Sequence, residues 1–364
     1  MITASALPKK LRQAYTLVEL LVVMAALTIL AAVLLPSIKS LLHDQKVASA
    51  SRMVKAHFEA AQARAIGGNS PVAVILERAS AEFPNMVTRL SIGQVFPPYE
   101  GDTTATTGTL LKTTGSDYYN ELAVVLGEAS LLSSAAGVFT TGDFLQVDDR
   151  QNIYQVLSFE DRTISGLAYR VIKFANPPFA TATNGTLHEL KEGDLLVDSR
   201  TTAARFRLYR KPTKSFLQTL TLPRGTCVDL SVSGLGPGGN EFATTSTGLA
   251  MVVFNPQGRI AYWNNGVDGP MAATSLMHVL IGRTEQVGAT LTDADLMRVA
   301  DPDDPSSFNT NINDTNNAWL TVNPFTGAIS SSGVQAGNEA TGTVAGRLPT
   351  ARAFATYGIT QSEN

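Results

Sequence analysis

The feature that most constrains this chain is an apolar run close to its amino terminus. From Leu20 to Leu35 the only polar side chain is Thr28. A helix over residues 15–35 would be about 30 Å long, which matches the hydrocarbon core of a bilayer. The segment before it carries three positive charges and no negative one, at Lys9, Lys10 and Arg12. Because basic segments stay on the cytoplasmic side, we expect a single-pass protein whose bulk lies outside.

Three interpretations of this segment compete. A secretory signal peptide has a shorter apolar core, and here the run continues through Ala31 and Ala32, the small residues that could mark a cleavage site. A plain membrane anchor fits the length but gives no reason for Glu19. A carboxylate within such a span costs roughly 2.5–3.5 kcal/mol on insertion scales, so Glu19 is a functional candidate.

The third interpretation comes from a resemblance. The segment Ala14-Tyr-Thr-Leu-Val-Glu19-Leu-Leu-Val-Val23 resembles the class III signal of type IV pilins and type II secretion pseudopilins. The resemblance implies cleavage between Ala14 and Tyr15 by a prepilin peptidase, N-methylation of Tyr15, and an assembly role for Glu19, the fifth mature residue. Pro36 then stands where many members carry a helix-kinking proline. The chain departs from the family in having Ala14 where glycine is usual and Tyr15 where phenylalanine is usual.

Electrostatics agrees with an assembly role for Glu19. Cleavage leaves a positive amine on Tyr15, and Glu19 of an incoming subunit can pair with that amine on a neighbour. The two charges then neutralise each other in a low-dielectric environment, which favours the correct axial register. The partners implied are other pilin or pseudopilin subunits, the peptidase and an inner-membrane assembly platform, with the carboxyl-terminal head in the periplasm.

Beyond Pro36 the pattern becomes amphipathic. Gly67-Gly68-Asn69 supplies a stop, so one helix is predicted from about Tyr15 to Ile66. Its part over residues 36–67 should lie on a β-sheet, because apolar residues recur there at steps of three and four. These are Ile38, Leu41, Leu42, Val47, Ala50, Val54, Phe58, Ala61 and Ala65.

Residues 70–330 read as a β-rich head of short strands divided by turns, with strong turn signals at 255–258 and 323–327. The predicted fold class is α+β and pilin-like, with a long amino-terminal helix packed on an antiparallel sheet. Residues 137–199 are expected to form an inserted β subdomain, and residues 331–364 a polar, flexible tail. The predicted strands are Val72–Glu77, Phe144–Val147, Ile153–Phe159, Leu167–Phe174, Ala204–Tyr209, Leu217–Leu222, Leu249–Phe254, Arg259–Trp263, Met277–Ile281 and Trp319–Val322.

Parts of the head also resemble known subfamilies. The stretches 58–76, 222–225 and 252–260 resemble the H-type minor pseudopilins, the GspH/FimT group. Residues 319–327 resemble the larger pilin-like proteins of the Verru_Chthon cassette.

The sequence offers little enzyme chemistry. It has no phosphate-binding loop, nucleophile elbow or metalloprotease helix, and its one cysteine excludes a disulfide framework. We predict no catalytic residue, cofactor or resident metal. Four acidic residues remain weak calcium candidates, although a solvated loop is the simpler interpretation: Asp301, Asp303, Asp304 and Asp314.

The sequence therefore predicts a minor pilin or pseudopilin rather than an enzyme. A membrane-anchored periplasmic β-domain that binds a ligand and never polymerises is the alternative. DNA uptake through a basic head is disfavoured, because the net charge is −3 and no basic run appears.

Overall fold

The computed structural model describes nine stretches of the chain, and its contacts separate into two units, 1–45 and 46–364. Each unit is treated by itself. The described residues are 17–112, 118–133, 136–148, 153–175, 203–245, 248–267, 270–287, 310–335 and 344–356.

One long helix, α1 (Leu17–Gly67), contributes to both units. In the second unit its buried stripe follows the predicted spacing of three and four residues, which places the stripe on one face. The helix ends as expected: the Gly68 N–H donates to the Arg64 carbonyl at 2.8 Å, and Asn69 takes a left-handed φ of 45°. The fully buried members of the stripe are Val47, Ala50, Val54, Phe58, Ala61 and Ala65.

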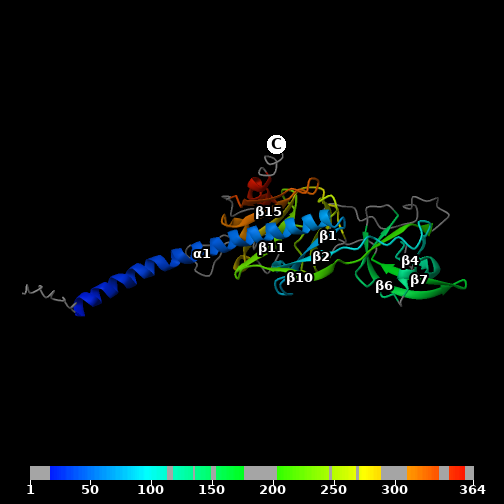
Figure 1. The fold of residues 1–364 in the computed structure, drawn as a ribbon, viewed down its shortest axis with the longest axis horizontal. Coiled ribbons are helices and arrows are strands. Elements are labelled where there is room, and N and C mark those ends of the chain that lie inside the picture. The colour runs from blue at the N-terminus through cyan, green and yellow to red at the C-terminus, as the bar shows by residue number, and fades with distance from the viewer. Residues whose placement is uncertain are drawn as a thin grey trace, which may run out of the picture. The chain divides into compact units, whose positions relative to one another are not determined.

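The helix packs on an antiparallel sheet (Figure 1). Strand β2 has a divided edge, because β10 pairs with its residues 89–94 and β11 with Met86 and Val87. In spatial order the strands are β13 (Ile260–Asn264), β12 (Ala250–Phe254), β1 (Val72–Arg78), β2 (Met86–Gln94), β11 (Thr226–Leu235), β14 (Met277–Arg283), β15 (Ala318–Val322) and β16 (Ile329–Gly333), with β10 (Thr213–Thr221) beside β2.

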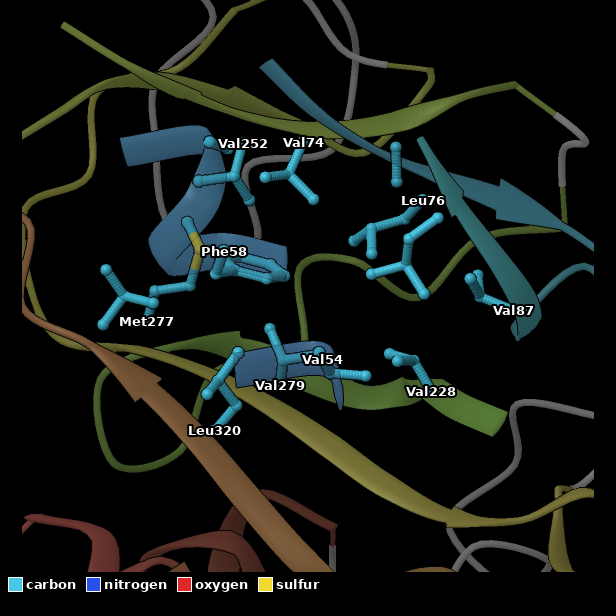
Figure 2. Packing of buried hydrophobic residues seen from close by; sticks show 14 of the residues in the cluster. Val54, Phe58, Val74, Leu76, Val87, Val228, Val252, Met277, Val279 and Leu320 are labelled. Carbon is cyan, nitrogen blue, oxygen red and sulfur yellow. The ribbon is translucent and has the colours of Figure 1, made fainter. Parts of the chain in front are cut away.

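The main core lies between α1 and this sheet. Figure 2 shows Phe58 with Val74 and Val252 on one side of it and Val279, next to Val54, on the other. The Phe58 ring meets the Phe254 ring edge to face, with centroids 6.3 Å apart. Burying one such side chain stabilises the fold by about 1.5–3 kcal/mol, so the stripe joins the helix firmly to the head.

A second sheet is inserted between β2 and β10. Its order is β8 (Ala203–Ala204), β3 (Gly108–Leu111), β4 (Glu121–Val125), β7 (Leu167–Phe174), β6 (Ile153–Ile164), β5 (Phe144–Val147) and β9 (Phe206–Tyr209). It has its own core, in which the rings of Tyr154 and Phe174 pack 5.1 Å apart. The insertion was predicted at 137–199, and that boundary is too narrow. The short strands β3 and β4 lack a clear alternation and are stabilised by β8 and β7, which lie far along the chain.

The predicted flexible tail needs a similar correction. Its described part contains the end of β16 and a helix, α3 (Val344–Ala351), whose Leu348 and Ala351 are fully buried. Arg352 is also fully buried and donates to three carbonyls of 232–239, at 2.6–2.8 Å. Burial lowers the pKa of Arg352 to about 9. Its guanidinium lies over the Trp319 ring, whose Nε1 donates to the Ala351 carbonyl, so α3 is held by its exit residue.

Candidate functional site

The predicted processing and assembly residues belong to the amino-terminal unit. Ala14 and Tyr15 lie outside the described residues. Glu19 and Pro36 lie in α1, and the helix continues through the proline. The side chains of Glu19 and of residues 31–43 are outside the described part, so the cut, the pairing and the kink stay predictions.

The described side chains at the start of α1 form an apolar stem. The large apolar side chains described between Leu17 and Leu30 are exposed, by 51% to 80%. Five consecutive ones, from Leu20 to Met24, cover all sides of the helix. A helix that is apolar all round needs cover from lipid or from other helices.

Hydropathy and length can also be tested on the structure directly. Within the described part of the chain, no helix is both long enough and apolar enough to cross a membrane.

The second half of α1 is clamped to the head by one polar side chain. The Gln62 Nε2 donates to the carbonyls of Gly258 and Gly327, both at 2.7 Å. These carbonyls belong to the two turns predicted at 255–258 and 323–327. Each turn is closed by its own asparagine, because Asn255 Oδ1 and Asn323 Oδ1 accept backbone N–H groups at 2.9–3.0 Å.

Close approach explains the glycine at the second turn. Gly327 has a φ of +79°, and a Cβ there would stand 2.2 Å from the Gly258 carbonyl oxygen. Only glycine fits both the left-handed backbone and the short distance. Sequence analysis found the two turns but missed Gln62. A polar residue among alanines beside the buried stripe was the available signal.

A polar group on the sheet links β1, β2 and β10. The Glu77 carboxylate accepts from Ser91 Oγ and pairs with Lys214 Nζ at 2.5 Å. Burial by itself raises the pKa of Glu77, but the bonds from Lys214 and Ser91 outweigh it and hold that pKa below its usual value. Since the carboxylate stays charged and occupied, this group ties strands together and offers no free base.

The calcium candidates are not brought together in the described residues. Asp301, Asp303 and Asp304 lie outside them. Asp314 is buried, and its oxygens accept from Gln286 Nε2 at 2.9 Å and from the Asn316 N–H at 3.0 Å. Among the described residues no group of three or more His, Cys, Asp or Glu side chains could hold a metal.

A comparison with family models identifies the motif at the amino terminus. Residues 9–35 match the model described as the prokaryotic N-terminal methylation motif. The chain carries a prepilin-type signal. This is the signal of type IV pilins and pseudopilins, and it implies processing by a prepilin peptidase and assembly with other pilins.

The prepilin-type match covers the leader and the apolar run and stops before the head. It includes Ala14, Tyr15 and Glu19, the residues singled out from the sequence. No curated protein and no solved structure matches the chain. The resemblance of the head to H-type or Verru_Chthon proteins therefore stays a prediction.

Proposed function

We propose that this protein is a minor pilin or pseudopilin, a structural subunit of a type II secretion pseudopilus or a type IV pilus-like filament. A prepilin peptidase cuts between Ala14 and Tyr15, and the new terminus is methylated. Residues 15–35 sit in the inner membrane until an assembly platform transfers the subunit to the filament, with the head in the periplasm.

One observation carries the proposal: the methylation-motif match contains an acidic residue at the fifth position after the small residue Ala14. A carboxylate in an apolar environment needs a positive partner, and the amine that cleavage frees on Tyr15 of a neighbouring subunit supplies it. The exposed apolar stem supports the same role, because subunit stems can replace lipid around one another.

The head supports a structural role as well. The buried stripe of α1 and the Gln62 clamp hold the second half of the helix on the sheet within the head. The family with this signal is structural, and the proposal assigns the head no reaction.

The test is the mass of the mature amino terminus. The full chain is expressed in two matched hosts, one with an active prepilin peptidase and one with an inactivated peptidase. We expect a methylated Tyr15 terminus in the first host and the intact leader in the second. The variant Ala14→Gly, which restores the family's usual residue before the cut, should be processed faster.

Other results would point elsewhere. The intact leader in both hosts would favour the anchored β-domain that does not polymerise. A terminus after Ala32 in both hosts would indicate an ordinary signal peptide.

A further inference from the structure

The second sheet contains a polar cavity of about 220 Å³ that the filament role does not use. It lies beside the end of β5 and the start of β9, next to the loop before β3. Four of its lining side chains are charged and two carry hydroxyls: Glu100, Asp148, Arg205, Arg207, Thr104 and Thr106.

Two of these charges already satisfy each other. Arg207 Nε lies 2.6 Å from Glu100 Oε1, and both side chains are more than a third exposed. Water screens such an exposed ion pair. The pair makes the cavity wall polar, but its two charges already neutralise each other.

Asp148 is different. Its residue is 9% exposed, and its φ of +52° is held by two bonds to the backbone of Arg205. The Asp148 N–H donates to the Arg205 carbonyl at 2.7 Å, and Asp148 Oδ1 accepts the Arg205 N–H at 3.1 Å. In the described part of the chain, the other oxygen, Oδ2, is buried without a hydrogen-bond partner.

An unpartnered buried carboxylate oxygen is costly, and a charged donor compensates it better than a neutral one. The Arg205 side chain is exposed and makes no ion pair with another described residue. The cavity therefore presents one buried carboxylate oxygen without a partner and, beside it in the lining, one exposed guanidinium that makes no ion pair with a described residue.

The charged groups of the lining narrow the class of ligand that the cavity can bind. Its two carboxylates would repel a phosphate, and its two guanidinium groups would repel a metal cation. A neutral sugar would leave the charge of Asp148 uncompensated. A molecule with both an ammonium and a carboxylate can pair with the Asp148 carboxylate and with the Arg205 guanidinium. The volume equals that of about seven waters at ~30 Å³ each, which is enough for a small amino acid.

We propose that this cavity binds a small α-amino acid as a zwitterion, with its ammonium on Asp148 and its carboxylate on Arg205. The inference is independent of the filament role, because it rests only on the second sheet.

The experiment is calorimetric titration of the full chain, kept in detergent, with L-alanine. A Kd of roughly 0.1–1 mM is expected for so small a ligand. Alaninamide, which lacks the carboxylate, and N-acetylalanine, which lacks the ammonium, should each bind at least about tenfold more weakly. Glucose tests the neutral-polyol alternative.

Two variants locate the site. Asp148→Asn keeps an Oδ1 acceptor and tolerates the left-handed backbone, and Arg205→Gln removes the positive charge. Each should weaken L-alanine binding at least about tenfold. Asp161→Asn is the matched control, since Asp161 on β6 pairs with Arg170 on β7 and does not line the cavity. Unchanged melting curves show that the variants fold.

The proposal is overturned by any of three results with the ligands and the two cavity variants, or by a fourth with the control variant. These are no heat from L-alanine, equal binding of glucose or of either half-ligand, or full binding by both Asp148→Asn and Arg205→Gln. Loss of binding in Asp161→Asn as well would show that the variants act through the fold and would also overturn it.

Discussion

At the scale of single residues, the head contains titratable groups held in unusual states by burial. His278 on β14 is fully buried, with Nδ1 2.9 Å from Thr321 Oγ1 and the Trp319 ring beside it. Burial, and then the charge of Arg352, lowers the pKa of His278 to about 3. The folded protein therefore keeps this imidazole neutral at a pH where the unfolded chain would protonate it.

The lowered pKa of His278 predicts that the stability of the fold depends on pH. An unfolded histidine has a pKa near 6.5, so the unfolded state binds the extra proton between about pH 6.5 and pH 3. The stability contributed by neutral His278 is fully present above pH 6.5 and is lost as the pH falls toward 3. His278→Gln, which cannot charge, should flatten that loss by up to about 1.4 kcal/mol per pH unit.

Urea unfolding at pH 7, 5.5 and 4.5 measures the effect. Thr321→Val is the control, because it removes the hydrogen-bond partner but keeps the imidazole, and it should retain the wild-type slope. Parallel pH profiles for the wild type and His278→Gln would contradict the assignment.

At the scale of elements, the docking of α1 depends on an apolar stripe and one polar clamp. The stripe is nonspecific in register, since alanines at 50, 61 and 65 could slide along a sheet. Gln62 adds direction, because its amide must reach two carbonyls from separate turns at once. The clamp therefore sets where the helix stops on the head.

The Gln62 clamp predicts that an isosteric substitution of this side chain lowers the free energy of unfolding. Gln62→Glu removes both donors and turns a carboxylate toward two carbonyl oxygens. We expect a loss of about 2–3 kcal/mol in the free energy of unfolding, since buried acceptors lose their partners. Denaturant unfolding at pH 7 measures it.

The reverse exchange at an exposed position of the same helix, Glu59→Gln, is the control. Glu59 makes only a 3.7 Å pair with Lys55, so its loss should be within about 0.5 kcal/mol. Equal stability of Gln62→Glu and Glu59→Gln would show that the two bonds do not hold the helix.

At the scale of the whole molecule, the chain combines an apolar stem with a head whose described residues form four buried apolar clusters, among them the one against α1 and the one in the inserted sheet. The head buries its own apolar surface, whereas the described stem side chains do not. Lipid or other helices can complete the burial of the stem, and Glu19 is the one acidic residue of its sequence between residues 15 and 35.

This arrangement predicts a separation of insertion from assembly. Glu19→Ala removes a costly charge from the stem, so membrane insertion should be intact, while incorporation into filaments should fall at least about tenfold because the neighbour's amine loses its partner. Membrane fractionation and co-purification with partner pilins measure the two steps.

The matched variant Glu59→Ala removes an acidic group from the head part of the same helix. It should leave both insertion and incorporation unchanged. Normal incorporation of Glu19→Ala would contradict the pairing role.

Prediction from sequence succeeded where the signal is local. The stripe from Val47 to Ala65, the stop at Gly67 and both asparagine turns were all found from spacing and turn chemistry. Strands β2, β3, β4 and β16 were not predicted, nor was the part of β11 beyond Val228. In β11 the reason is visible: Asp229, Ser231 and Ser233 are polar yet buried, so the strand shows no apolar alternation.

Those buried polar groups are satisfied partly by one another and partly by residues distant in sequence. Asp229 is paired with Asn311 Nδ2 at 2.9 Å as well as with Ser231, and burial raises the pKa of its carboxyl. Nothing in the order of residues near Asp229 indicates that partner.

The amino-acid sequence by itself determined the stem, its basic leader and the prepilin-type signal, because a linear motif and an apolar run need no tertiary contacts to be recognised. Only the tertiary structure decided which strands pair, that the inserted sheet has a core of its own, and that half-buried Gln62 and buried Arg352 hold the two helices to the sheet. The Gln62 bonds join residues 196 and 265 positions apart. Such contacts depend on how the sheet folds around the helix, and no local pattern records them.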